Sequence, residues 1–357
     1  MTSTRARALG ALTGLVALAV AASGCSVIGG GSADDSSSAS GRVVLVTHDS
    51  FSLPKSLQRR FEQQSGYDLV VLQEGDAGQL TNKLVLTKDD PLGDVAFGVD
   101  NTFASRALDA GVFAPYSWQT PAGASAYDLP GDSRHALTPV DEGNVCVNVD
   151  DTWFKAHHQA PPKTFDDLTS PAYKNLFVLP GAATSSTGLA FLLATIAKYG
   201  DGWQGYWSRL MDNGAEITSG WEDAYEVDFT QGGGHGDRPV VLSYDSSPAY
   251  TVPKGSQTST TSALLDTCFR QVEYAGVLTG AANPKGAQAL VRFLDSKQVQ
   301  AALPTSMYVF PVVDGVPLPK QWAKFAVQPD HPYAVAPADI AAHRADWLRE
   351  WSDVTSR

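Results

Sequence analysis

The stretch from residue 217 to residue 250 holds the side chains of this sequence whose types and spacing could do chemistry. It contains one tryptophan and three tyrosines, together with many carboxylates and a single arginine. Aromatic faces beside carboxylates are what a flat organic cation needs for binding. The alternative is a buried strand over 240–244 with a helix in front of it, and this stretch alone leaves both interpretations open.

The composition is that of a globular protein and argues against nucleic acid as a partner. The chain has 357 residues, enough for two domains of ordinary size, and 43% of them are hydrophobic. Its formal net charge is −12 at pH 7, whereas binding to a phosphate backbone requires a basic face. We therefore expect folded domains with real cores and no nucleic-acid partner.

The N-terminus predicts export. Residues 1–25 read as a signal peptide, in which two arginines precede an apolar run over 8–22. This run is shorter than the ~20 residues that a membrane-spanning helix needs. It ends in Ala-Ser-Gly-Cys, which resembles the bacterial lipobox and predicts lipidation of Cys25. Alanine at position 22 departs from the usual leucine, and the alternative is secretion after cleavage near 21–23.

Residues 26–41 are rich in glycine, serine and aspartate and contain almost nothing to bury. Such a composition is typical of a flexible tether. With a lipid on Cys25, this tether would hold the folded body at the outer face of the cell membrane, or in the periplasm.

Short apolar strands alternate with helices along the folded body, which predicts a parallel α/β sheet. Two such units, with a late segment returning toward the first, indicate two lobes joined by crossovers. We expect lobe 1 to comprise 42–139 plus about 262–305, and lobe 2 to comprise 140–261 plus about 306–357. A cleft between lobes is a common site for a small molecule, and hinge closure is the expected motion.

Polar side chains follow directly after several strands of the first unit. In open α/β sheets, ligands bind in the crevice at the carboxyl ends of the strands. These positions are therefore candidate ligand contacts: His48, Asp49, Asp76, Asp100 and Asn101.

A loop of small residues with several hydroxyls, 182–187, precedes an apolar helix predicted over 188–199. Hydroxyls and free N–H groups at a helix N-terminus can bind an anion. The alternative is ordinary N-capping by Ser186 or Thr187.

The sequence contains none of the common catalytic or phosphate-binding motifs. There is no G-x-x-x-x-G-K-[ST], no H-E-x-x-H and no G-x-S-x-G. The seven histidines show no metal-ligand spacing, and the pair at 157–158 lies in a loop that reads as solvated. We therefore expect a binding protein without a metal or a cofactor.

Two cysteines besides Cys25 occur in the chain, Cys146 and Cys268. Both lie in strand-like runs, and in an exported protein such a pair can form a disulfide. The alternative is two buried free thiols.

The order of these motifs resembles the thiamine-binding substrate receptors of ABC importers, a branch of the extracellular solute-binding proteins related to ferric-iron binders. The most specific signature is S-G-W-x-x-A-Y at 219–225 followed by S-Y-x-x-S-P-A-Y at 243–250. The resemblance extends over about 43–351 and implies the two-lobed type II periplasmic-binding-protein fold. Its other landmarks are THDSF (47–51), GVDN (98–101), TSSTGLAFLL (184–193), LPTSMYVFPV (303–312) and HRADWLREW (343–351).

The resemblance implies an aromatic clamp formed by Trp221, Tyr244 and Tyr250. It also implies that Ser185 and Ser186 belong to a small hydroxyl loop at the site. In relatives that accept thiamine phosphates, this loop and the position of Trp221 lie near the phosphate.

Three positions depart from the best-known members of the family. His48 stands where a tyrosine is common, Lys55 lies near where a tryptophan occurs, and Tyr308 replaces a tryptophan. His48 and Tyr308 can still stack on a ligand, whereas Lys55 cannot.

We expect the acidic half of the site to come from Asp76, which matches the acidic turn of the family, and from Asp100. By contrast, Glu222, Asp223 and Asp228 are expected to form a solvated helix face. A carboxylate could accept a hydrogen bond from the amino group of thiamine and complement its charge.

The function implied by the resemblance is that of a monomeric receptor, which binds thiamine or a thiamine phosphate and delivers it to a permease with a cytoplasmic ATPase. A receptor for ferric iron is an alternative, with Tyr244, Tyr250 and His48 as ligands. A secreted thiamine-degrading enzyme is a third hypothesis. It would need a nucleophilic cysteine beside a carboxylate, and Cys146 and Cys268 both lie in apolar runs.

Overall fold

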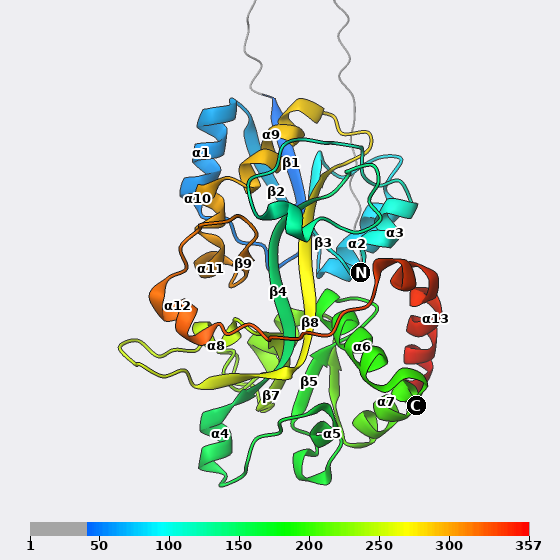
Figure 1. Ribbon diagram of the computed structural model, residues 1–357, viewed down its shortest axis with the longest axis vertical. Coiled ribbons are helices and arrows are strands. Elements are labelled where there is room, and N and C mark those ends of the chain that lie inside the picture. The colour runs from blue at the N-terminus through cyan, green and yellow to red at the C-terminus, as the bar shows by residue number, and fades with distance from the viewer. Residues whose placement is uncertain (1–40, 357) are drawn as a thin grey trace, which may run out of the picture. The chain divides into compact units, whose positions relative to one another are not determined.

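The computed structural model describes residues 41–356, and Figure 1 shows their arrangement. The predicted signal peptide, the lipidation site Cys25 and the predicted tether up to residue 40 lie outside the described residues. Within 41–356 the strands form one mixed sheet of nine strands, flanked by helices. This confirms the predicted α/β class.

The outer strands of the sheet are parallel and its centre is antiparallel. The parallel groups are β2-β1-β3 on one side and β7-β5-β6 on the other. Within each group, helical crossovers link consecutive strands, as the alternating sequence pattern predicts. The strand order is β2 (Asp68–Gln73), β1 (Arg42–Thr47), β3 (Val95–Asp100), β8 (Thr261–Val277), β4 (Thr138–Asp150), β7 (Val240–Tyr244), β5 (Phe177–Pro180) and β6 (Glu216–Thr218), with β9 (Phe310–Pro311) paired to β4.

The two long central strands, β4 and β8, connect the parallel groups (Figure 1). The C-terminal part of β8, from Glu273 to Val277, pairs with β3. The C-terminal part of β4, which runs antiparallel to β8, pairs with β7. The register between β4 and β8 shifts midway, where Val145 faces Phe269 but Val147 faces Leu264. The chain of β8 therefore bulges at this point.

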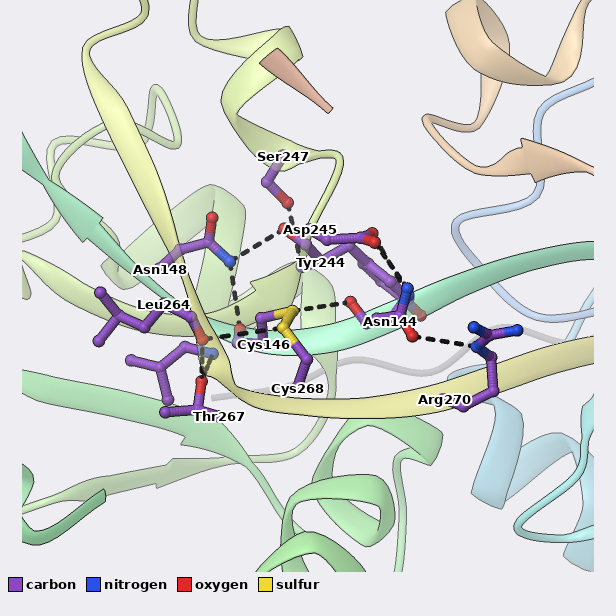
Figure 2. The surroundings of a disulfide bond; sticks show 11 residues. Asn144, Cys146, Asn148, Tyr244, Asp245, Ser247, Leu264, Thr267, Cys268 and Arg270 are labelled. Atoms are coloured by element: carbon purple, nitrogen blue, oxygen red, sulfur yellow. Dashed lines mark hydrogen bonds between the residues drawn. A yellow bond between two sulfur atoms is a disulfide. The ribbon is translucent and has the colours of Figure 1, made fainter. Parts of the chain in front are cut away.

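A disulfide between Cys146 and Cys268 joins β4 to β8 at this bulge (Figure 2). The two Cα atoms are 4.2 Å apart. Thr267, inside the bulge, accepts a hydrogen bond of 3.0 Å from the main-chain N–H of Val147. The predicted pairing of the two cysteines is confirmed.

Helices α1 (Lys55–Ser65) and α9 (Pro284–Leu294) pack on β2 and β1, and on each other. Gly66 ends α1 in the left-handed conformation, with φ of 74°, which glycine adopts without steric cost. Asn283 caps α9 by accepting from the N–H of Gly286, and a proline opens the helix. The remaining helices of this region are α2 (Ala77–Leu86), α3 (Ala104–Asp109), α10 (Lys297–Gln300) and α11 (Leu303–Ser306).

Helix α6 (Ser186–Tyr199) is apolar on most of its faces because it is covered by β8, by α7 (Trp203–Asp212) and by other strands. The C-terminal helix α13 (Pro337–Thr355) packs on α7 and on α3. Among the described helices, none is both long and apolar enough to cross a membrane. The shorter helices here are α4 (Asp151–Ala156), α5 (Phe165–Leu168), α8 (Ser247–Tyr250) and α12 (Lys320–Phe325).

The helix expected to carry Glu222, Asp223 and Asp228 differs from an ordinary α-helix. Residues Asp223–Asp228 form a π-helical segment, η4, in which the N–H of Phe229 donates to the carbonyl of Ala224. Single π-helical turns are rare and often occur at functional sites. The widened turn lies next to the cleft described below.

Candidate functional site

A cleft of about 370 Å³ is lined by residues from the loop after β1, from α2, η4 and the residues just before each of them, from α6, β7, α8 and β8, and from the end of α11 with the segment after it. Its volume is in the range of small-molecule sites. Eight of the predicted site residues line it: His48, Asp49, Asp76, Ser186, Trp221, Tyr244, Tyr250 and Tyr308.

One wall of the cleft is aromatic. The rings of Trp221 and Tyr225 are stacked, with centroids 4.9 Å apart and an interplanar angle of 13°. Tyr244 meets Trp221 edge-on at 6.3 Å, and Tyr250 meets Tyr308 at 5.1 Å with perpendicular planes. Sequence reasoning missed Tyr225 as a lining residue. Its position four residues after Trp221, on the same helical face, is the signal that could have found it.

Serine side chains hold the aromatic wall from behind. Trp221 Nε1 donates a hydrogen bond of 3.0 Å to Ser243 Oγ, and Ser243 Oγ lies 2.8 Å from Ser247 Oγ. The main-chain N–H of Tyr244 also donates to Ser247 Oγ. The indole is therefore oriented by β7 and by the first residue of α8.

Tyr308 has a φ of 57°, in the left-handed region that bulky residues rarely adopt. Its N–H donates to the carbonyl of Leu303, which fixes the turn after α11. Strain of this kind persists where the surrounding structure determines it, and it is often found at binding sites. Here it places the Tyr308 ring against Tyr250.

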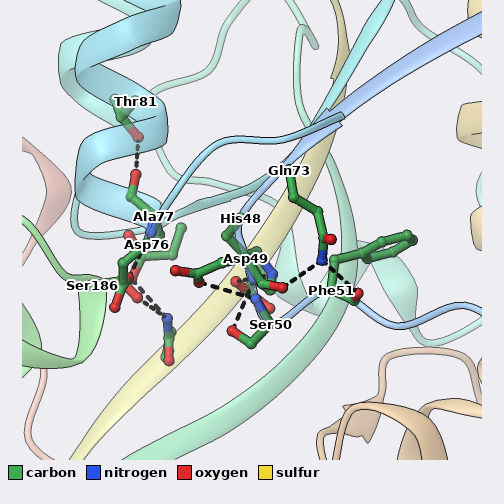
Figure 3. Close-up of polar contacts among 12 residues, drawn as sticks. His48, Asp49, Ser50, Phe51, Gln73, Asp76, Ala77, Thr81 and Ser186 are labelled. Carbon is green, nitrogen blue, oxygen red and sulfur yellow. Dashed lines mark hydrogen bonds and ion pairs between the residues drawn. The ribbon is translucent and has the colours of Figure 1, made fainter. Parts of the chain in front are cut away.

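Asp76 connects the two sides of the cleft and is 7% exposed. Its Oδ1 accepts from the N–H of Ala77 at 2.6 Å, and its Oδ2 accepts from the N–H of Trp221 at 2.8 Å. Burial raises the pKa of Asp76 to about 6, against the opposing effect of these hydrogen bonds. Figure 3 shows Asp76 next to Ser186, with His48 and Asp49 on the neighbouring segment.

At the inner end of the cleft, His48 Nε2 lies 3.5 Å from Glu273 Oε1. The distance alone would permit an ion pair. However, burial lowers the pKa of His48 to about 4 and raises the pKa of Glu273 well above its usual value. We therefore assign a neutral imidazole at neutral pH, so that the contact is not an ion pair, and burial favours the protonated form of the Glu273 carboxyl. The buried carboxyl of Asp141 beside Glu273 also raises the pKa of Glu273.

Sequence reasoning missed Glu273 as a lining residue. It alternates with Gln271 along a strand that is otherwise mostly apolar, so both side chains lie on one face of β8. Two polar residues two positions apart in a buried strand are a sequence signal from which this part of the site could have been predicted.

Three of the predicted site residues do not line the cleft. Asp100 is fully buried and closes the turn before α3, accepting from the N–H groups of Thr102 and Phe103. Asn101 bonds the backbone of β8 at Arg270 and Val272. Asp100 and Asn101 therefore stay outside the cleft lining, because their polar atoms satisfy main-chain groups of neighbouring segments.

Ser185 is the third residue outside the cleft. It is completely buried, and its Oγ lies 2.9 Å from Thr187 Oγ1. Ser186 and Thr187, the next residues of the predicted hydroxyl loop, do line the cleft.

The expectation that Glu222, Asp223 and Asp228 form a solvated helix face was wrong in one respect. Glu222 lines the cleft, together with Glu226. Asp223 and Asp228 are not among the lining residues, as expected. Within residues 41–356, no three histidine, cysteine, aspartate or glutamate side chains are grouped in a way that could hold a metal ion.

Comparison with known proteins places these features in a family. Over 321 residues the chain is 28% identical to the thiamine-binding periplasmic protein of Escherichia coli, covering 88% of this chain and 94% of that protein. The same identity is found with the thiamine-binding periplasmic protein of Brucella melitensis, over 88% and 92% of the two chains. A solved periplasmic thiamin binding protein superposes with a TM-score of 0.77 at 27% identity, covering 88% of this chain and 96% of that one.

The model of one protein family matches residues 90–344, which is most of the chain. The two-lobed periplasmic binding proteins among the structural neighbours have the same arrangement of helices around a mixed sheet. The chain therefore belongs to the bacterial extracellular solute-binding proteins.

Proposed function

We propose that this chain is an exported receptor that captures thiamine in the cleft and delivers it to the permease of an ABC importer, which a cytoplasmic ATPase drives. The observation that carries the proposal is the aromatic wall around Trp221 in a cleft of small-molecule size that carboxyl side chains also line. The names of the relatives in Escherichia coli and Brucella melitensis support the choice of ligand.

The chemistry of thiamine fits the residues of the cleft. Its thiazolium ring is permanently cationic, and each aromatic face can attract a cation by about 0.5 to 2 kcal/mol. The aminopyrimidine ring is flat and can lie against Trp221 or the tyrosines. Asp49 and Glu222 offer carboxylates at the opening, whereas Asp76 is already committed to main-chain N–H groups. Capture requires no covalent step, so the proposal includes no catalytic residue.

The proposal includes two lobes, with 42–139 plus about 262–305 in one and 140–261 plus about 306–357 in the other. The long strands β4 and β8 would then be the crossovers about which the lobes close on the ligand. Lipidation of Cys25 and a tether over 26–41 would keep the receptor close to its permease.

Isothermal titration calorimetry of the purified protein with thiamine tests the proposal. We expect one site per chain and a Kd below about 10 µM, which corresponds to roughly −7 kcal/mol. If circular dichroism shows that the protein is folded and no binding is detected at that level, the thiamine assignment is wrong. A variant with Cys25→Ala should leave binding intact and release the protein from the membrane fraction.

A further inference from the structure

We infer that Glu273 and Asp141 form a carboxyl pair that selects a cationic ligand by giving up a proton when the ligand binds. The pair holds this proton in the free receptor. The proton passes to solvent when the positive charge of the ligand takes its place. The inference rests on the proposed function and deepens it, because it names the residues that distinguish a permanent cation from a neutral molecule of the same shape.

The two carboxyl groups meet between the long central strands. Asp141 of β4 lies opposite Glu273 of β8 in the strand register, and the two side chains are hydrogen-bonded to each other. Asp141 is 1% exposed and Glu273 is 7% exposed. A carboxylate only accepts hydrogen bonds, so two carboxyl groups can bond each other only when one of them carries a proton. The pair therefore shares a proton, as buried carboxyl groups in contact generally do.

No basic side chain of the cleft lining offsets the charge of this pair. Among the described lining residues none is a lysine or an arginine, and Arg270 Nε lies 3.8 Å from Glu142 Oε2, outside the cleft. The imidazole of His48 stays neutral, because burial lowers its pKa to about 4. Ionisation of both members of the pair therefore needs a positive charge from outside the protein. The titratable groups that face the pair are Asp76, Asp100, Glu142, Asp295, Tyr244 and His48.

The pair is in reach of a ligand through Glu273, which lines the cleft, whereas Asp141 does not. His48 lines the same cleft and is 6% exposed, yet its Nε2 has no hydrogen-bond partner within residues 41–356. Buried polar atoms are normally hydrogen-bonded, so this nitrogen, 3.5 Å from Glu273 Oε1, indicates that a ligand completes this end of the cleft. A cation bound there would favour the ionised form of Glu273, since charges attract strongly where water is excluded.

Calorimetry in buffers of different ionisation enthalpy counts the protons that are released on binding. We expect about one proton per thiamine at pH 7.5, and a Kd that falls by up to about tenfold per pH unit between pH 6.5 and pH 8.5. Asp76 contributes little at pH 7.5, because its pKa of about 6 leaves it mostly ionised before binding. Thiamine binding without proton release would overturn this inference while the receptor function stands. Absence of thiamine binding would overturn both.

Deazathiamine, in which a carbon atom replaces the charged ring nitrogen of thiamine, separates the effect of charge from that of shape. We expect it to bind at least about tenfold more weakly than thiamine at pH 7.5 and to release no proton. Either equal affinity or equal proton release would contradict selection by charge.

Glu273→Gln, checked for folding by circular dichroism, assigns the proton to the pair. This variant should release almost no proton at pH 7.5. The matched control is Glu226→Gln, the same change at another lining residue, which should still release about one proton. Asp141→Asn is a second test, because its amide can donate to ionised Glu273 and should lower the number of protons released. A full proton released by both Glu273→Gln and Asp141→Asn would place the proton on another group and contradict the assignment.

Discussion

Asp76 and Trp221 are 145 positions apart in the sequence, yet the main-chain N–H of Trp221 donates a hydrogen bond of 2.8 Å to Asp76 Oδ2. The same carboxylate accepts from the N–H of Ala77 at the start of α2. The Asp76 side chain therefore caps the start of α2, and it also holds the main chain of Trp221, where the aromatic wall begins. This relationship explains why Asp76 matters to the site without being free to contact a ligand through both oxygens.

Replacing Asp76 by alanine should weaken both the fold and the cleft. Loss of the N-cap of α2 is expected to lower the free energy of unfolding by about 1 kcal/mol. Because the N–H of Trp221 also loses its acceptor, we expect the affinity for thiamine to fall about tenfold or more. Thr164→Ala is the matched control, since Thr164 caps α5 far from the cleft lining. It should lower stability by a similar amount and leave the Kd unchanged.

Replacing Trp221 by alanine should abolish most ligand binding, because it removes the central ring of the aromatic wall and exposes the face of Tyr225. We expect the Kd, measured by calorimetry, to rise about tenfold to a hundredfold. Asp228→Ala on the same segment should change the Kd little. The reverse outcome, with Asp228 important and Trp221 dispensable, would contradict the placement of the ligand against this wall.

Breaking the disulfide should destabilise the protein. Cys146 and Cys268 are separated by 122 positions, and loop-closure estimates for a crosslink of this length give about 4 to 5 kcal/mol, with measured values often lower. Dithiothreitol should therefore lower the melting temperature by several degrees. The double variant Cys146→Ala with Cys268→Ala should melt at the lower temperature in both conditions. A melting temperature that is the same with and without reductant in the unmodified protein would refute the prediction.

Loss of the disulfide should also affect the cleft. Cys146 lies opposite Ser243 in the pairing of β4 with β7, and Ser243 orients the indole of Trp221. We expect the double cysteine variant to bind thiamine several-fold more weakly at a temperature where it remains folded. An unchanged Kd would show that β7 holds Ser243 without help from the crosslink.

Buried acids should make the protein less stable as the pH rises. Burial raises the pKa of Asp295 to about 8, and within residues 41–356 its two carboxyl oxygens accept no hydrogen bond. Its unfolded pKa is about 3.8, so between about pH 4 and pH 8 the native state holds a proton that the unfolded state has lost. The contribution of Asp295 to the free energy of unfolding is fully present below about pH 4, and it declines as the pH rises toward 8.

Melting curves of Asp295→Asn and of the unmodified protein between pH 5 and pH 9 test this direction of the pH dependence of stability. The amide cannot ionise, so the melting temperature of the variant should rise relative to the unmodified protein as the pH increases. Asp201→Asn, at an exposed position, is the control and should show a constant difference. A difference for Asp295→Asn that shrinks with increasing pH would mean that the group is ionised in the native state.

Much of the fold could be predicted from local patterns. Strands and helices alternate with clear apolar periods, and the caps and stops, such as Gly66 after α1, act within a few residues. The aromatic clamp of Trp221, Tyr244 and Tyr250 was implied by the resemblance to a known family, and all three residues line the cleft. The pairing of Cys146 with Cys268 could be proposed because each lies in its own strand-like run.

The roles of the polar residues were decided by tertiary structure. Asp49 and Asp100 both lie at or just after the end of a strand, but Asp49 lines the cleft whereas Asp100 closes the turn before α3 and accepts a hydrogen bond from Gln271 of β8. Glu222 turns into the cleft and Glu273 reaches its inner end, although neither was predicted to do so. A carboxylate is an equally good ligand contact, cap or solvated charge, and local sequence does not distinguish these uses. The choice depends on which N–H groups and charges are brought to it by distant segments, as the contact between Asp76 and Trp221 shows.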